Sequence, residues 1–373
     1  MNALVLGLVF VTAFLVVLYS TPPLIKVAIL KRLFDEPGER KIHTRVIPTI
    51  GGIIIFAATL FSYSLWFELD FSKFHNMIEL NSSYTGQYIR EFKLIVATLL
   101  MLFFVGIKDD IIGTAPIKKL IAQLLAALIL VLVGNIRITG LHGIFEVYEI
   151  PYWASVFLSL FTFIVVVNAF NLIDGVDGLA AGVGFIVTMT FGIWFFLAND
   201  IILASLAFAL GGSLLGFLVF NFSPAKIFMG DSGSLTIGLV ACVLAIKLIE
   251  YPTDKLQELQ MYLSKPVFVV ATLVYPLADT LRVFTLRAST GVSPFSADRN
   301  HLHHRLIDCG LNHRGTVIII YMFNLLMIGI SIACYKLNPS ISLIVVIAFA
   351  LLCTGVLQLV FRAKRKSKKI SEK

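Results

Sequence analysis

Four short polar stretches lie between long apolar segments and carry the side chains most able to do chemistry. They are GIKDD at 106–110, NAFNLIDGVDG at 168–178, FMGDSGS at 228–234 and DRNHLHHR at 298–305. Carboxylates and amides are costly beside a membrane span, which invites a functional explanation for each. Their oxygens suit a hard divalent cation, and neighbouring glycines let the backbone approach a ligand. These residue types predict a site for a divalent cation and phosphorylated ligands.

The stretch 168–178 holds two Asp and two Asn. Asp174 and Asp177 are three residues apart, so one helical turn would place both on the same face. The alternative is an Asx turn that caps the next helix. A cap needs one Asp, whereas this stretch also carries Asn168 and Asn171. We therefore favour a ligand-binding role.

The adjacent carboxylates Asp109 and Asp110 end an apolar segment. They repel each other unless a cation lies nearby, and such pairs hold Mg²⁺ or orient an attacking group. The alternative is a solvated pair compensated by Lys108, Lys118 and Lys119. Both interpretations place a cation beside the pair.

Asp231 lies between two glycines at the start of another apolar segment. This arrangement is typical of an anion site at a helix N-terminus, and one carboxylate there fits a metal that bridges to phosphate oxygens. The alternative is that Asp231 only caps the helix.

Three histidines and two arginines fall within residues 299–305. No acidic residue or Cys has the spacing to complete a zinc site with them. Forked Arg and imidazole side chains suit phosphates and sugar hydroxyls better. A basic loop that binds lipid headgroups is the alternative.

The composition excludes a soluble protein of several domains. Apolar residues make up 58% and charged residues 14% of the 373 positions, and the mean hydropathy is +0.92, which indicates a polytopic membrane protein. The net charge of +8 lies in short loops and the C-terminal tail and fits anionic headgroups or phosphorylated ligands. A nucleic-acid partner is disfavoured, because the aromatic residues lie in the apolar segments. The four cysteines show no disulfide or zinc spacing.

The fold class predicted is an all-α integral membrane protein with about eleven transmembrane helices. The first segment lacks a basic n-region and a cleavage site, so we expect it to be retained. The predicted spans are 2–22, 50–68, 92–108, 119–136, 152–168, 180–198, 201–220, 234–251, 266–284, 316–335 and 341–361.

Lysine and arginine concentrate in alternate connections and in the tail 362–373. By the positive-inside rule these segments are cytoplasmic. Eleven spans then put the N-terminus outside, with a single transmembrane catalytic domain over 1–361 and a basic cytoplasmic tail over 362–373. All four polar stretches fall on the cytoplasmic face. A transporter would instead place its carboxylates near span midpoints, where only Asp279 lies, one turn from Arg282.

The four stretches, in this order from Asp35 to about Gly315, resemble the polyprenyl-phosphate N-acetylhexosamine-1-phosphate transferases of glycosyltransferase family 4. That family includes enzymes that initiate O-antigen and teichoic-acid linkage units, and the phospho-MurNAc-pentapeptide translocase. The resemblance implies transfer of a sugar-1-phosphate from a UDP-sugar to undecaprenyl phosphate, with release of UMP. It also implies Mg²⁺, with Mn²⁺ as an alternative, and a multi-pass protein of the bacterial inner membrane with a cytoplasmic active site.

The resemblance implies a role for each matching residue. Asp231, helped by Asn171, is the expected metal ligand, and Asp109 and Asp110 match the catalytic pair. The other implied residues are Lys119 for phosphate, Phe228 for uracil stacking, Asn168, Asp174 and Asp177 for the nucleotide, Arg299, His301, His303 and His304 for the sugar-phosphate, and Asp35 and Arg45 in a first-loop motif. Gly113 departs from the family, which often has a third Asp there.

The histidine stretch also bears on the sugar. HLHH preceded by Asn is typical of the family's GlcNAc-1-phosphate transferases, whereas the translocase typically has Pro before its histidines. We therefore expect UDP-GlcNAc as donor, with another UDP-HexNAc or UDP-MurNAc-pentapeptide as alternatives. A single in-line displacement is expected, a route through an aspartyl-phosphate is its rival, and a homodimer is left open.

Overall fold

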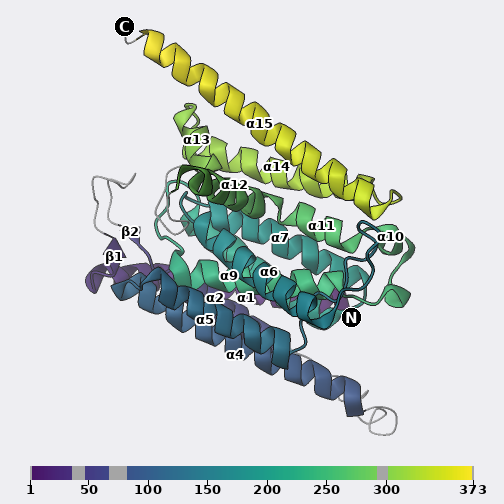
Figure 1. Ribbon diagram of the computed structural model, residues 1–373. Helices are drawn as coiled ribbons and strands as arrows, with labels where there is room; N and C mark the ends of the chain where they lie inside the picture. Colours follow the sequence, from purple (N-terminus) through teal and green to yellow (C-terminus); the bar gives the residue numbers. More distant parts are fainter. Residues whose placement is uncertain (1, 36–46, 67–81, 292–300, 372–373) are drawn as a thin grey trace.

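The computed structural model describes residues 2–35, 47–66, 82–291 and 301–371. Over these residues the protein is almost wholly helical, which confirms the predicted all-α polytopic class. The exceptions are the connections between helices, of which 134–151 is the longest in the described part, and a short antiparallel pair, β1 (Phe34–Asp35) and β2 (Ile47–Pro48), in which Phe34 faces Pro48. Figure 1 shows α4 along one edge of the bundle, α15 along the opposite edge, and α9 in its interior.

The helices follow the apolar segments of the sequence. The first group is α1 (Asn2–Leu30), α2 (Gly52–Leu65), α4 (Ser82–Ile112), α5 (Pro116–Leu128) with the π-helical turn η1 (Ile129–Val133), and α6 (Tyr152–Leu172). The second group is α7 (Leu179–Leu197), α8 (Ile201–Asn221), α9 (Gly230–Ile249), the 3₁₀ turn η2 (Thr253–Lys255), α10 (Glu258–Tyr262), α11 (Lys265–Thr272), α12 (Val274–Thr290), α13 (Leu302–Asp308), α14 (His313–Ala333) and α15 (Pro339–Ser371).

The predicted spans coincide with helices, but not all of these helices meet the length and hydropathy expected of a span. In the described part of the chain eight helices do, and the bent pair α11 and α12, at 72° to each other, makes a ninth if it counts as one span. The predicted spans 50–68 and 92–108 fall on α2 and α4. Helix α2 has only 14 residues, fewer than the roughly 20 that cross a bilayer. The count of eleven therefore stays a prediction.

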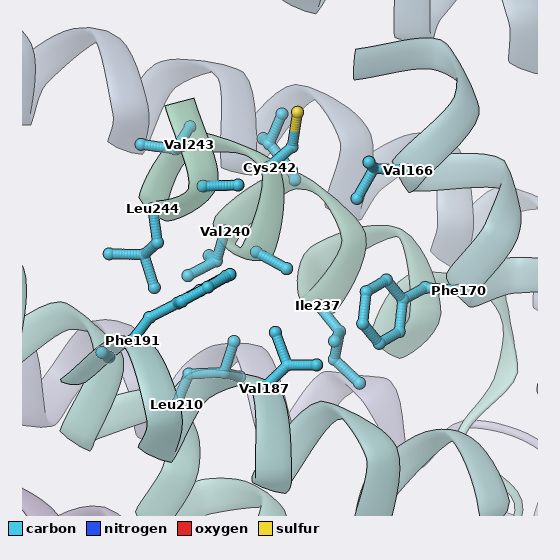
Figure 2. Packing of buried hydrophobic residues seen from close by; sticks show 14 of the residues in the cluster. Val166, Phe170, Val187, Phe191, Leu210, Ile237, Val240, Cys242, Val243 and Leu244 are labelled. Atoms are coloured by element: carbon cyan, nitrogen blue, oxygen red, sulfur yellow. The ribbon is translucent and has the colours of Figure 1, made fainter. Parts of the chain in front are cut away.

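Helix α9 is the core of the bundle. Its residues are almost all buried, and it packs against α2, α4, α6 and α7. Figure 2 shows Ile237, Val240 and Leu244 of α9 facing Val187 and Phe191 of α7. A helix apolar on all sides is expected to be surrounded by other helices.

Glycines set how closely the neighbours approach the first half of α9. A Cβ on Gly52 of α2 would lie 2.0 Å from the Gly233 nitrogen, and one on Gly106 of α4 would lie 2.5 Å from Ser232 Cα. Small residues allow such close helix packing in membranes. Three segments distant in sequence thus meet at the N-terminus of α9.

Candidate active site

The N-terminus of α9 is held by a carboxylate from α4. Asp110 accepts hydrogen bonds from the backbone N–H of Asp231 (2.6 Å) and of Ser232 (3.1 Å), and from the Ser232 hydroxyl (2.6 Å). The first N–H groups of a helix have no partner within the helix, and a carboxylate there also meets the positive end of the helix dipole. Asp110 therefore acts as the cap of α9, supplied by another helix.

The segment before α9 is fixed by the short connection that leads into α2. Phe228 donates its N–H to Pro48 (2.7 Å), and the N–H groups of Gly51 and Gly52 bond to the carbonyls of Phe228 (2.9 Å) and Met229 (2.7 Å). Gly230 then turns with φ +72, a conformation that side chains disfavour. A Cβ there would also lie 2.6 Å from Asp110 Oδ1. This backbone pairing places Asp231 beside the Asp109–Asp110 pair.

Asp231 is held from two sides. Lys119 of α5 donates to Asp231 Oδ2 and to Asp109 Oδ2, the latter at 2.9 Å. Asn171, at the end of α6, donates from Nδ2 to Asp231 Oδ1 (2.9 Å) and to the Ser234 hydroxyl (3.0 Å). Lys119 is thus the cation that the sequence placed beside the carboxylate pair, and it also bridges that pair to Asp231.

A cavity of about 360 Å³ opens at this cluster. Its lining residues are Thr49, Asp109, Asp110, Asn171, Asp174, Gly175, Val176, Asn221, Phe228, Gly230 and Asp231. Six of these were predicted site residues, and they come from three of the four polar stretches of the sequence. Three of the four stretches thus meet at one cavity, whereas none of the described histidines is among its lining residues.

Burial and repulsion between carboxylates raise the pKa of two carboxyl groups that line the cavity. Burial raises the pKa of Asp110 to about 6, although its hydrogen bonds from Ser232 and Asp231 oppose this shift. Burial, and then the charges of Asp231 and Asp110, raise the pKa of Asp174 well above its usual value. Concentrated negative charge of this kind favours a cation, or a ligand that arrives with one.

The histidines at the start of α13 lie next to the same loop. A Cβ on Gly175, a cavity residue, would lie 3.2 Å from His303 Nε2. His301 and His303 are buried, their rings stack at 5.3 Å and 7°, and His304 lies beside them with its ring 4.4 Å from that of His303. Burial lowers the pKa of His303 to about 3. His303 is therefore a neutral side chain packed against Gly175, which lines the cavity.

Two predicted nucleotide-site residues lie outside the lining of the cavity. Asn168 exchanges hydrogen bonds with Gln123 of α5 (2.7 and 3.4 Å). Asp177 accepts from the N–H of Ala225 (3.0 Å), in the loop before α9. In this arrangement both residues hold segments that carry the site.

The structure does not describe the side chains of three predicted residues. Arg45 and Arg299 lie outside the described residues. Asp35 belongs to β1, opposite Ile47, but its side chain is not among the described ones. Their roles stay predictions.

Sequence reasoning missed Asn221 and Ser232. Asn221 accepts a hydrogen bond from the Gly178 N–H (3.0 Å) and donates one to the Ile227 carbonyl (2.9 Å). It therefore joins the loop before α7 to the loop after α8. An amide at the end of an apolar segment is costly unless it is satisfied, and that signal was present in the sequence. Ser232 gave no such signal, because its partner Asp110 is 122 residues away.

The donor set fits a divalent cation only in part. Among the described residues, no three His, Cys, Asp or Glu side chains converge as a complete metal site. Mg²⁺, however, is usually held by one or two carboxylates, with phosphate oxygens and water as its remaining ligands. Asp231 at the cavity meets that requirement. Asn171 presents its nitrogen to Asp231, so here it orients the carboxylate.

Comparison with known proteins finds the same kind of protein repeatedly. Residues 92–249 match the family model for glycosyl transferase family 4. A probable undecaprenyl-phosphate N-acetylglucosaminyl 1-phosphate transferase of Bacillus subtilis is 30% identical over 319 residues, which cover 84% of this chain and 80% of the relative. A decaprenyl-phosphate N-acetylglucosaminephosphotransferase of Mycobacterium tuberculosis is 31% identical, covering 85% and 80%. An undecaprenyl-phosphate alpha-N-acetylglucosaminyl 1-phosphate transferase of Salmonella typhi is 27% identical, covering 82% and 78%.

Proposed function

Because the chain belongs to glycosyl transferase family 4 and is a phosphotransferase of the membrane, we propose that it transfers GlcNAc-1-phosphate from UDP-GlcNAc to undecaprenyl phosphate. UMP is released, and the product initiates a cell-envelope glycan. The observation that carries the proposal is the cavity in which Asp109, Asp174 and Asp231 meet next to Lys119. Carboxylates arranged around a cation suit a nucleotide diphosphate that binds with Mg²⁺.

The residues divide the work of binding the donor. Phe228 lines the cavity just before Asp231, where its ring can stack on uracil. The Lys119 ammonium lies between the carboxylates of Asp109 and Asp231. It can turn toward the phosphate oxygens of the donor and stay close to these carboxylates. When bound to Asp231, Mg²⁺ supplies positive charge for the diphosphate. Asn171 keeps the Asp231 carboxylate oriented.

The reaction we propose is one in-line displacement. An oxygen of the lipid phosphate attacks the β-phosphorus, the bond from that phosphorus to the bridging oxygen breaks, and the bridging oxygen leaves with UMP. A phosphate monoester has its second pKa near 6, so the nucleophile is mostly dianionic at neutral pH. Both oxygens of Asp110 are used to cap α9, which favours Asp109 as the residue that orients the lipid phosphate. Isolation of a sugar-phosphoryl enzyme in the absence of lipid would favour the two-step route instead.

The first prediction concerns the donor. Purified protein with undecaprenyl phosphate and Mg²⁺ is incubated separately with UDP-GlcNAc, UDP-GalNAc and UDP-MurNAc-pentapeptide, and UMP is measured. We expect release that depends on the lipid and is fastest with UDP-GlcNAc. Faster release with another donor would change the proposed sugar, and no release with any of them would overturn the proposal.

The second prediction concerns orientation. We propose eleven spans in a bacterial inner membrane, with the N-terminus outside and the cavity facing the cytoplasm. Lys226 lies in the loop beside the cavity, and Glu149 lies beyond the opposite end of α6; both side chains are exposed. The native cysteines Cys242, Cys309 and Cys334 are buried and Cys353 is half-buried, so background labelling should be low.

Lys226→Cys and Glu149→Cys are compared with an impermeant maleimide. We expect Glu149→Cys to react in intact spheroplasts and Lys226→Cys only in inverted vesicles. The unsubstituted protein measures the background in each preparation. The reverse pattern would show that the protein has the opposite orientation in the membrane.

A further inference from the structure

Helix α12 carries a buried carboxylate that the proposed reaction does not use. Asp279 has no exposed surface. Its Oδ2 lies 2.8 Å from His301 Nδ1, and its Oδ1 accepts a 2.7 Å hydrogen bond from the Leu302 N–H at the start of α13. A third contact, from Oδ2 to His303 Nδ1, is longer at 4.0 Å. All three contacts go to the histidine segment.

One turn earlier on α12, Tyr275 serves the second buried histidine. Its hydroxyl lies 3.3 Å from His303 Nδ1, and both side chains are at most 1% exposed. Residues four apart lie on one helix face, so Tyr275 and Asp279 form a single support. Asp279 contacts the Nδ1 atom of His301, and Tyr275 contacts the Nδ1 atom of His303, whose ring stacks on that of His301.

We propose that Asp279 is a positioning residue that fixes His301 with its proton on Nδ1, and that Tyr275 does the same for the orientation of His303. The proposal rests on the proposed function, because it assigns these rings to the sugar-phosphate side of the same cavity. An ionised carboxylate can only accept hydrogen bonds. At 2.8 Å from Asp279 Oδ2, the Nδ1 atom of His301 must therefore carry the proton and donate it.

As a consequence, the neighbouring rings of His301 and His303 have different hydrogen-bonding roles. His301 donates its Nδ1 proton to the carboxylate, so its Nε2 atom is left as a hydrogen-bond acceptor. The Nδ1 atom of His303 lies 3.3 Å from the Tyr275 hydroxyl and 4.0 Å from Asp279 Oδ2, and burial lowers the pKa of His303 to about 3 in spite of that carboxylate. The Nε2 atom of His303 is then a neutral hydrogen-bonding group close to Gly175, a residue that lines the cavity.

A purely structural role would also explain the contacts, because Asp279 caps α13. Asp279→Asn separates the two roles. The Asn oxygen can still accept from Leu302 N–H and keep the cap, but its NH₂ group then faces His301 Nδ1. Two donors cannot share one hydrogen bond, so the proton of His301 must move to Nε2.

The experiment uses full-length protein in detergent with ¹⁵N-labelled histidine. We expect a His301 resonance of the Nδ1–H form in the unsubstituted protein, identified by its loss in His301→Gln, and its conversion to the Nε2–H form in D279N. We also expect kcat for UMP release to fall roughly 10- to 100-fold, with KM for the donor little changed and Tm preserved. Thr285→Ala, an exposed position on the same helix, is the control and should match the unsubstituted protein.

The outcomes are separable. An unchanged His301 resonance, or an unchanged kcat, in D279N overturns the positioning role. If the unsubstituted protein releases no UMP from any donor, the proposed function fails, while the resonance still decides whether Asp279 fixes the ring. Tyr275→Phe keeps the carboxylate and the ring packing and tests His303 alone: we expect a smaller fall in kcat, and no fall would remove Tyr275 from the support.

Discussion

Replacement of Asp231 by Asn is expected to lower UMP release by about a thousandfold and to remove what remains of its dependence on Mg²⁺. Asn is nearly the same size, and its oxygen can still accept the hydrogen bond from Asn171 that Asp231 Oδ1 accepts. Its NH₂ group, however, would face the Lys119 ammonium, which now binds Asp231 Oδ2. The variant therefore loses negative charge where the metal is proposed to bind, with little change in packing.

The measurement is the rate of UMP release over a titration of Mg²⁺, together with Tm in detergent. Asp254→Asn is the control, because Asp254 is exposed on η2, beyond the other end of α9, and should leave rate and Mg²⁺ dependence unchanged. A D231N protein with normal turnover and a normal Mg²⁺ response would remove Asp231 from the metal site.

Replacement of Gly52 by Ala is expected to destabilise the protein and to impair the site at once. The new Cβ would lie 2.0 Å from the Gly233 nitrogen and 2.4 Å from the Ser232 hydroxyl, so α2 and α9 would have to separate. Overpacking of this kind costs about 1–3 kcal/mol. The start of α9 would move with it, and a shift of about 1 Å at a reacting group can cost roughly a hundredfold in rate.

Tm and the rate of UMP release report the two effects separately. Gly329→Ala is a matched control: this glycine also lies inside a helix, α14, but a Cβ there has nothing within 4 Å, so both quantities should stay near their original values. If G52A kept both its Tm and its rate, the close contact between α2 and α9 would not be needed to hold the site.

Much of the fold could be predicted because hydropathy is a local property. A run of apolar residues can satisfy its backbone in a membrane only as a helix or a closed barrel, so the positions of α6, α7, α8 and α9 followed from composition and length. Polar side chains are costly beside a membrane span, and this cost drew attention to Asp109, Asn171, Asp174 and Asp231. The length of an apolar run did not predict where a helix is shorter than a span or bent. Helix α2 is short, and α11 and α12 meet at a 72° bend.

The contacts within the site could not be predicted, because each joins residues far apart in the chain. Lys119 binds a carboxylate 112 positions away, and Asp110 caps α9 through the N–H of Asp231, 121 positions later. Local patterns assigned Asp110 only to a reacting pair, and placed Asn168 and Asp177 at the ligand, whereas their hydrogen bonds hold other segments. The sequence by itself determined that this is a membrane protein with carboxylates, a lysine and histidines at the ends of its apolar segments. Only the tertiary structure decided which of them meet at the cavity and which support those that do, because that depends on how closely α2, α4 and α6 can pack against α9.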